Sequence, residues 1–262
     1  MNAAGLEEAA RRVRRAAEKR TPCEPVRDLI PAGDVAAAYA VQEINTKLGL
    51  EQERSLVGRK IGLTSTVVQE QLGVDQPDYG MLFADMGVLS GEEVAIDRLL
   101  QPKVEAEIAF VLRKDLDAEK LSEADLINAI DCALPAIEIV DSRIANWDIS
   151  ITDTVADNAS SGLFVLGESP RQLSEIDLEG CEMVMQRHGE VVSSGVGAAC
   201  LGNPLIATRW LAETMAKAGR PLRSGDIVLS GALGPMVTVQ AGDEYSVSIS
   251  GLGTVSTVFS AS

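Results

Sequence analysis

The stretch VEAEIAFVL, residues 104–112, is apolar at every position except its two glutamates. Side chains two residues apart on a strand point to the same face, so Glu105 and Glu107 lie side by side. The apolar residues that follow on both faces favour a central strand of a buried sheet. Two carboxylates this close repel each other and raise one pKa unless a cation neutralises them. The segment therefore indicates a metal site, and the alternative is a solvated alternation of polar and apolar side chains.

A second apolar run, LPAIEIVDS at residues 134–142, carries one acid, Glu138, in its middle. An unpaired buried carboxylate is costly, so Glu138 needs a partner. Three carboxylates on two central strands suit Mg²⁺ or Mn²⁺, which are hard cations that prefer oxygen ligands in octahedral geometry. The alternative is an ion pair within the protein, for which Lys60 in VGRKIGLTS (residues 57–65) is the obvious candidate.

Outside these two runs, most of the chain beyond Glu92 consists of short strand-like segments separated by turn signals such as RHGE and AGDE. This pattern predicts a rolled or sandwiched β-structure. Helical patterns interrupt it at residues 122–132 and 204–219. No G-x-G-x-x-G follows a first strand and no G-x-x-x-x-G-K-[ST] occurs, so nucleotide-binding folds have no support.

The N-terminal part of the chain has helical periodicity instead. Residues 5–19 place Ala and Leu on one face and a stripe of Arg and Lys opposite. Asp34 is a good N-cap for a second helix over residues 35–48. We therefore expect an α+β protein, with residues 1–55 as an N-terminal helical segment and residues 56–262 as one compact β-rich body.

Composition excludes several classes of function. The 262 residues are 46% apolar, enough for a sizeable core, and 23 Lys+Arg against 39 Asp+Glu leave a net charge of −16, which repels nucleic acid and anionic membranes. No apolar run approaches the roughly 20 residues that span a bilayer, and the N-terminus has no apolar signal core. His188 is the one histidine and the four cysteines form no CxxC pair, so Cys/His zinc sites are excluded. We expect a cytoplasmic protein whose chemistry rests on carboxylates, Lys, Ser and Tyr, with no nucleic-acid or membrane partner.

A polar loop, DTVADNASSG at residues 153–162, precedes a further strand-like run, GLFVLG. Such a loop serves as a turn with Asx and Ser caps, or it offers hydrogen-bond donors to a bound anion. Both alternatives are open from the residues alone. The candidate side chains are Asp153, Asp157, Asn158, Ser160 and Ser161.

Five motifs in order and spacing resemble one known family, over essentially residues 40–260. This is the hydratase and decarboxylase family of the fumarylacetoacetate hydrolase superfamily, which includes 2-hydroxypenta-2,4-dienoate (2-keto-4-pentenoate) hydratases and 4-oxalocrotonate decarboxylases. The motifs are GRKIGLTS (58–65), GVDQPDYGML (73–82), QPKVEAEIAFVL (101–112), PAIEIVDSRI (135–144) and DTVADNASSGLFVLG (153–167). The resemblance implies a mixed, rolled β-structure for the catalytic body and assembly into a homo-oligomer.

The resemblance also implies roles for particular residues. The family's Mg²⁺ or Mn²⁺ ligands fall on the three acids singled out above, Glu105, Glu107 and Glu138. Its active-site lysine and loop acid fall on Lys60 and Asp78. Its substrate-contacting serine falls on Ser160, and we expect Ser161 and Asn158 of the same loop to contact the substrate as well.

The implied activity is that of a hydro-lyase in the meta-cleavage degradation of aromatic compounds. The enzyme would add water to 2-hydroxypenta-2,4-dienoate, or a close alkyl homologue, to give 4-hydroxy-2-oxopentanoate. Decarboxylation of 4-oxalocrotonate (2-oxo-3-hexenedioate) is the alternative, but a second carboxylate needs a cation, and only Arg59 and Arg143 stand next to the motif residues. An alternative of another class is a non-catalytic oligomerising partner in a complex of neighbouring pathway enzymes. The length of the substrate tail and the choice between Mg²⁺ and Mn²⁺ are open.

Overall fold

The protein forms two β-sheets with helices packed on the larger one, in a computed structural model that describes residues 3–65, 69–70 and 74–262. The α-helices are α1 (Ala3–Lys19), α2 (Val35–Glu51), α4 (Glu123–Ala129), α5 (Ile151–Ala156) and α6 (Pro204–Lys217). The larger sheet contains β1 (Leu56–Gly62), β2 (Asp78–Phe83), β3 (Gly87–Leu89), β5 (Pro102–Leu112), β6 (Ile130–Asp141), β7 (Ser161–Leu166), β10 (Ile227–Ala232) and β11 (Val237–Thr238). The smaller sheet contains β4 (Glu93–Val94), β8 (Glu182–Arg187), β9 (Glu190–Val196), β12 (Glu244–Ile249) and β13 (Gly253–Phe259).

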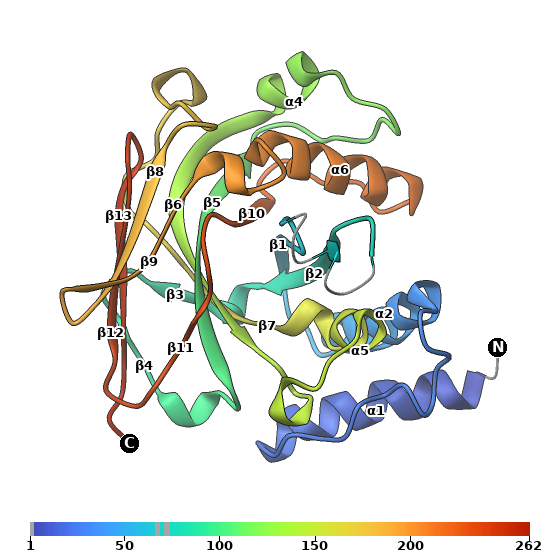
Figure 1. Ribbon diagram of the computed structural model, residues 1–262. Coiled ribbons are helices and arrows are strands. Elements are labelled where there is room, and N and C mark those ends of the chain that lie inside the picture. Colours follow the sequence, from blue (N-terminus) through green and yellow to red (C-terminus); the bar gives the residue numbers. More distant parts are fainter. Residues whose placement is uncertain (1–2, 66–68, 71–73) are drawn as a thin grey trace.

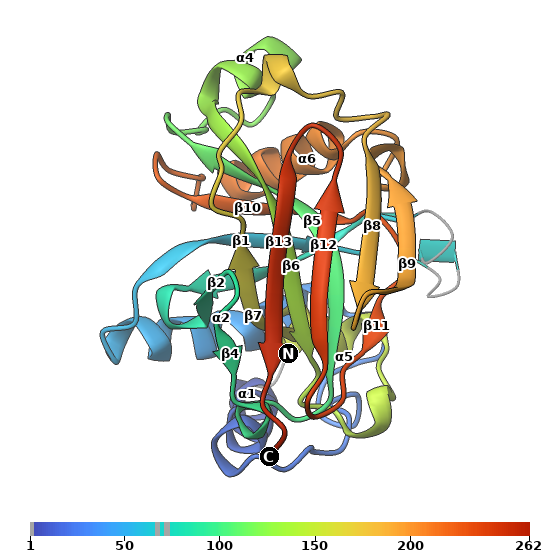
Figure 2. The same cartoon turned by 90° about the vertical axis from the view of Figure 1, so that its left-hand side faces the viewer.

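The larger sheet is mixed and strongly curved. Its strand order is β2-β1-β10-β5-β6-β7-β3, with β11 paired to β5, and the β1–β10 and β3–β7 pairs are parallel whereas the others are antiparallel. The long strands β5 and β6 curve through the middle of the molecule, with the smaller sheet on one side and the helices on the other (Figure 1). Figure 2 shows the smaller sheet face-on, with β13, β12, β8 and β9 side by side. The predicted rolled or sandwiched β-structure is confirmed.

The two apolar runs that carry the glutamates are central strands, as predicted. Strand β5 lies between β10 and β6, and β6 lies between β5 and β7. Fully buried side chains from both strands, such as Phe110 and Ile137, belong to the main hydrophobic core between the sheets. Because both faces of β5 and β6 are covered over most of their length, Glu107 and Glu138 are withdrawn from bulk water.

The N-terminal helices begin and end close to their predicted positions. Asp34 caps α2 by accepting a hydrogen bond from the Ala37 backbone N–H at 2.9 Å. Helices α1 and α2 share a second hydrophobic core with Ile144 and Val155, which lie beyond residue 55. The predicted division at residues 55 and 56 therefore stays a prediction, because the helical segment packs directly on the following body.

Three further features concern the rest of the chain. The helical patterns at 122–132 and 204–219 correspond to α4 and α6, although residues 130–132 already belong to β6. His188 lies at the exposed turn between β8 and β9. Among the described residues, no helix combines the length and apolar character needed to cross a membrane.

Candidate active site

The three predicted metal ligands come together on one face of the β5–β6 pair. Glu105 lies directly opposite Glu138 in the antiparallel register, and Glu107 follows two residues later on the same face. Their carboxylate oxygens all lie within 4.8 Å of one another. The acids converge because of the register in which β5 pairs with β6, and no local sequence feature reveals that register.

Burial and mutual repulsion dominate the electrostatics of this triad. Burial, reinforced by Glu138, raises the pKa of Glu105 to about 7, and the same causes raise the pKa of Glu107 well above its usual range. Glu107 Oε2 accepts a hydrogen bond from the Gly231 backbone N–H at 2.7 Å, and its Oε1 is buried without a hydrogen-bond partner among the described residues. Glu138 Oε2 is likewise buried without a hydrogen-bond partner among the described residues. Three converging carboxylates with unpartnered oxygens fit a divalent cation, which both neutralises and ligates them.

Lys60 reaches the triad across the curved sheet. Its Nζ lies 2.9 Å from Glu138 Oε1, although β10 and β5 separate β1 from β6 in the strand order. Burial alone would lower the pKa of Lys60, but the surrounding carboxylates outweigh it and the pKa is raised. The ion pair considered as an alternative to a metal therefore exists. One ammonium cannot neutralise three glutamates, so the ion pair and the metal site are compatible.

Asp78 is the fourth acid of the site and begins β2, opposite Gly62 at the end of β1. Burial raises the pKa of Asp78 to about 6, although the nearby Lys60 ammonium opposes this shift. Its Oδ1 is buried without a hydrogen-bond partner in the described chain. A Cβ atom at position 62 would stand 2.2 Å from that oxygen, so the approach of Asp78 to the lysine depends on a glycine there.

The polar loop predicted at residues 153–162 forms α5 and a short 3₁₀ turn, η4 (Asn158–Ser160). Asn158, Ala159 and Ser160 adopt left-handed backbone conformations, with φ of 56°, 51° and 53°. Such a run is costly for residues with a Cβ and concentrates at functional sites. Ser160 is buried, and its Oγ lies 3.4 Å from Thr154 Oγ1.

The other two predicted substrate contacts hold the loop in place. The Asn158 side chain accepts from the Met81 backbone N–H at 2.7 Å and donates to the Met81 carbonyl at 2.9 Å. Ser161 Oγ donates to the Asn158 carbonyl at 2.8 Å. The two Asn158 bonds attach η4 to β2, next to Gly80, which pairs with Lys60. A direct contact of Asn158 or Ser161 with substrate stays a prediction.

Of the two arginines beside the motifs, Arg143 is paired with an acid, whereas Arg59 has a buried Nε without a hydrogen-bond partner among the described residues. Arg143 pairs with the fully buried Asp157 and donates to the carbonyls of Asp141 and Ser161 at 2.6 and 2.7 Å. Arg59 is buried on the face of β1 opposite to Lys60, because neighbouring side chains on a strand alternate, and it donates to the Gly58 carbonyl. Neither guanidinium faces the triad.

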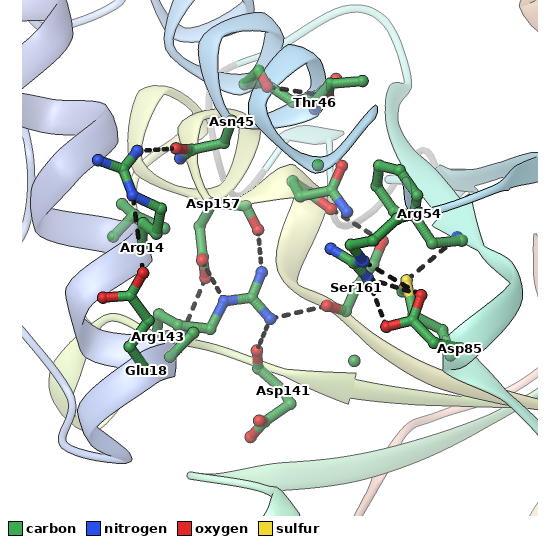
Figure 3. Close-up of a pocket in the computed structure, with 18 of the residues that line it drawn as sticks. Arg14, Glu18, Asn45, Thr46, Arg54, Asp85, Asp141, Arg143, Asp157 and Ser161 are labelled. Carbon is green, nitrogen blue, oxygen red and sulfur yellow. Dashed lines mark hydrogen bonds and ion pairs between the residues drawn. The ribbon is translucent and has the colours of Figure 1, made fainter. Parts of the chain in front are cut away.

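A cavity of about 460 Å³ lies between the N-terminal helices and residues of strands β2 and β7. Figure 3 shows that Arg14, Arg54 and Arg143 in its wall are each bonded to neighbouring polar side chains. No glutamate of the triad lines this cavity, nor does Lys60. This cavity is therefore lined by residues other than the cluster of acids.

Three residues close to the acids were not singled out in the sequence. Gly62 and Gly231 matter because acids approach their backbones, and a glycine in a strand is the available signal for such an approach. Lys103 lies two residues before Glu105 and so on the same face. The same alternation that paired the glutamates could have identified it.

The sheet is mixed and rolled, and converging carboxylates and a buried lysine lie on its inner face. These features place the protein in the class of enzymes with a divalent-metal site. Residues 57–260 match the family described as "Fumarylacetoacetate (FAA) hydrolase C-terminal". The chain belongs to the fumarylacetoacetate hydrolase family, which confirms the expected family and fold.

The relatives and solved structures agree with this assignment. The chain is 66% identical to the "TodF product hydratase" of Pseudomonas putida F1, over 90% of this chain and 88% of that protein. It is 63% identical to "2-keto-4-pentenoate hydratase 1" of Dechloromonas aromatica, over 90% and 89%. A 4-oxalocrotonate decarboxylase from Pseudomonas putida G7, complexed with magnesium and adipate, superposes with a TM-score of 0.95 at 35% identity, over 99% of this chain and 98% of that one.

Proposed function

We propose that this protein is a hydratase that converts 2-hydroxypenta-2,4-dienoate, or a close alkyl homologue, into 4-hydroxy-2-oxopentanoate. Relatives that are 53–66% identical over nearly the whole chain are named 2-keto-4-pentenoate hydratase or, in one case, TodF product hydratase. The observation that carries the mechanism is the convergence of three carboxylates opposite Lys60 and Asp78. A cation site beside a lysine and a protonatable acid can polarise a 2-oxo acid and move its protons.

Glu105, Glu107 and Glu138 would hold Mg²⁺ or Mn²⁺, since an all-carboxylate site accepts either ion. When bound, the cation supplies Lewis acidity toward the carboxylate and the C2 oxygen of the substrate. Gly231 fixes the orientation of Glu107 through its backbone N–H. The remaining steps depend on the side chains that face this site.

Two proton transfers and one addition complete the reaction. The dienol loses its O2 proton and gains a proton at C5, which gives a 2-oxo-3-enoate. Water then adds across C3 and C4, with the hydroxyl on C4 and the proton on C3. Lys60 holds a positive charge among four acids and would stabilise the negative charge that develops on the C2 oxygen. Asp78 has a pKa of about 6 and would carry the protons.

Ser160 would bind the substrate carboxylate at the side of the site formed by η4. Its left-handed conformation costs free energy that the packing of η4 on β2 must offset, which is typical of a residue held for function. Thr154 Oγ1 is its hydroxyl neighbour at 3.4 Å. Ser161 and Asn158 would support this contact by fixing the turn.

Decarboxylation of 4-oxalocrotonate is the second candidate, because the full-length superposition on a 4-oxalocrotonate decarboxylase is close. The metal site would be the same in both enzymes. The hydratase is favoured because sequence identity to the hydratases is much higher, and because Arg143 is already paired with Asp157. A non-catalytic oligomerising partner is disfavoured, since such a protein has no need to keep Lys60, Asp78 and the triad together.

The protein would act in the cytoplasm as a homo-oligomer. Four free cysteines fit a reducing cytoplasm. Exposed apolar side chains on edge strands, Leu89 on β3 and Val191 on β9, support a homo-oligomer, as an exposed edge favours association with another copy. The pathway would be the meta-cleavage degradation of aromatic compounds, in which a complex with neighbouring enzymes is open to test by co-purification.

The test is the ultraviolet absorbance of 2-hydroxypenta-2,4-dienoate with the purified protein, with and without Mg²⁺ or Mn²⁺. A parallel run uses 2-oxo-3-hexenedioate, and Glu107→Gln serves as the matched inactive variant. We expect metal-dependent loss of the dienol signal, with 4-hydroxy-2-oxopentanoate as product. Release of CO₂ from the diacid, with the pentadienoate untouched, would transfer the protein to the decarboxylase branch. No turnover of either compound would contradict both activities.

A further inference from the structure

Lys103 is a cation on the metal face of β5 that the mechanism above does not use. It lies two residues before Glu105, so both side chains project from the same face of the strand. No acid lies within ion-pair distance of its ammonium among the described residues. Its Nζ sits instead over the Trp147 ring, 4.1 Å from the ring centroid.

The site opens toward Lys103. Glu107 and Glu138 have 0% and 1% of their surface exposed, whereas Glu105 and Lys103 are both partly exposed. Going along β5 from Glu107 to Lys103 therefore leads from the closed end of the triad to its accessible end. Lys103 is therefore placed beside the part of the triad that solvent reaches.

The aromatic ring under the ammonium is fixed in position. Trp147 Nε1 donates to the Gln101 carbonyl at 3.0 Å, and the Gln101 side chain accepts from the Asn146 backbone N–H at 2.7 Å. Asn146 and Trp147 both adopt left-handed conformations, with φ of 58° and 55°. A cation held over a fixed ring keeps its remaining hydrogen-bond donors free for an anion.

The net charge of the site explains why a further cation is useful beside it. When ionised, the three glutamates and Asp78 carry four negative charges against the single positive charge of Lys60, so a divalent cation leaves the site with one net negative charge. The whole protein carries −16. An anionic substrate would be repelled by this field, and Lys103 brings the site to neutrality at its open end.

We propose that Lys103, held over Trp147, is the cation that captures the carboxylate of the substrate at the entrance of the metal site. The inference rests on the proposed function for the identity of the anion, a small 2-oxo or 2-hydroxydienoic acid. Lys103 is thus a substrate-binding residue, and its contribution to affinity falls with ionic strength because solvent-exposed charges are screened.

The kinetic test compares Lys103→Gln and Lys103→Arg with Lys114→Gln, a control at an exposed lysine beyond the end of β5. We expect Lys103→Gln to raise KM about tenfold, with kcat changed by less than about twofold, which corresponds to one partly screened charge pair. Its kcat/KM should also lose most of its dependence on ionic strength. Lys103→Arg should restore both properties, and Lys114→Gln should behave as wild type.

A binding test does not require turnover. Mn²⁺ affinity is measured first, and then the affinity of the Mn²⁺-loaded protein for pyruvate is measured by titration. Lys103→Gln should weaken pyruvate binding about tenfold and leave Mn²⁺ affinity unchanged or slightly higher, since a cation next to Glu105 is removed. If pyruvate affinity is unchanged, or if Mn²⁺ affinity falls together with it, the inference is overturned.

The two proposals fail in distinguishable ways. If the wild type turns over no dienoate but the pyruvate result holds, the hydratase function is wrong and the role of Lys103 stands. If Lys103→Gln impairs only the diacid 2-oxo-3-hexenedioate and not the pentadienoate, the lysine binds a distal carboxylate instead. That outcome would overturn the entrance role.

Discussion

Glu107 shows how much of the site depends on the surroundings of single residues. Its side chain has no exposed surface, one oxygen accepts from the Gly231 N–H, and the other has no hydrogen-bond partner in the described chain. Glu105 has the same residue type and faces the same way, yet it is partly exposed. Burial and the Gly231 hydrogen bond fix the orientation of the Glu107 carboxylate. It would serve as a fixed metal ligand, because it cannot turn to solvent when the cation leaves.

Glu107→Gln tests this ligand. We expect Mn²⁺ affinity and turnover to fall by roughly a hundredfold or more, since even changes around metal ligands cost up to that much. The fold should persist, because the neutral amide still accepts from Gly231 and no longer repels the other acids. Isothermal titration with Mn²⁺ and sedimentation of the variant check both points, with Glu182→Gln on the exposed side of β8 as control. Normal Mn²⁺ binding by Glu107→Gln would refute the ligand assignment.

Gly62→Ala tests the approach of Asp78. The added methyl group would meet Asp78 Oδ1 at 2.2 Å, so the carboxylate must move away from the lysine. We expect kcat to fall about 10- to 100-fold, because a misplacement of about 1 Å in a reacting group has this effect. Mn²⁺ affinity should stay near that of the wild type, as the triad lies on other strands. Unchanged kcat would mean that Asp78 does not handle protons.

At the scale of elements, the segment from α5 to β7 borders the site and also connects distant parts of the chain. We call its bonds through Asp153 and Asp157 the clamp. Asp153 accepts from the Ser150 N–H and from the Val26 N–H, which joins the start of α5 to the N-terminal segment. Asp157 accepts from the Arg143 backbone and side chain at the other end of the helix. The capping alternative for this loop is thus realised for Asp153, whereas Asp157 binds Arg143. Ser160 is the hydroxyl that these bonds leave for another partner.

Arg143→Gln tests the clamp. The change leaves Asp157 buried without its cation, and breaking a buried pair in this way costs about 3 kcal/mol or more of unfolding free energy. Urea denaturation measures the loss. Arg223→Gln is the matched control, since its ion pair with Asp115 is exposed and should matter little. Equal stability of the two variants would show that the clamp carries no stability.

At the scale of the whole molecule, the curvature of the larger sheet creates the site. Lys60 and Glu138 lie on strands separated by two others, and only the roll of the sheet brings their charged ends to 2.9 Å. The smaller sheet packs on the convex side and excludes water there, whereas α2, α5 and α6 cover the other side. Four acids confined in this way strain the protein electrostatically unless a cation is present.

Metal removal should therefore have a pH-dependent effect on stability. The pKa of Glu105 is raised from 4.5 to about 7, so its favourable contribution is complete below 4.5 and is lost as the pH rises through about 7. We expect Mg²⁺ to raise the Tm of chelator-treated protein more at about pH 8 than at about pH 5.5, where protons compete with the metal. Differential scanning calorimetry of wild type beside Glu107→Gln measures this increment. An equal increment at both pH values would contradict the shared site.

The sequence is more informative about the strands of the site than about its loop. Alternation along an apolar strand identified Glu105 and Glu107, since the side-chain period of a strand is fixed at two. In the loop, composition left the turn and the anion site open, and the structure shows the side chains of Asn158 and Ser161 hydrogen-bonded within the protein, so their contact with substrate stays a prediction. Loop side chains follow no period, so their direction depends on contacts with distant strands such as β2.

Residue types and their spacing by themselves determined the α+β class, the central position of the two acidic strands and the chemistry available without histidine or thiolate metal ligands. Those properties are local, because hydrophobic pattern and side-chain period act within a few residues. Only the tertiary structure decided that Glu138 faces Glu105, that Lys60 reaches Glu138, that Arg59 points away and that Lys103 lies over Trp147. These facts depend on strand register and on the roll of the sheet, which result from packing over the whole chain.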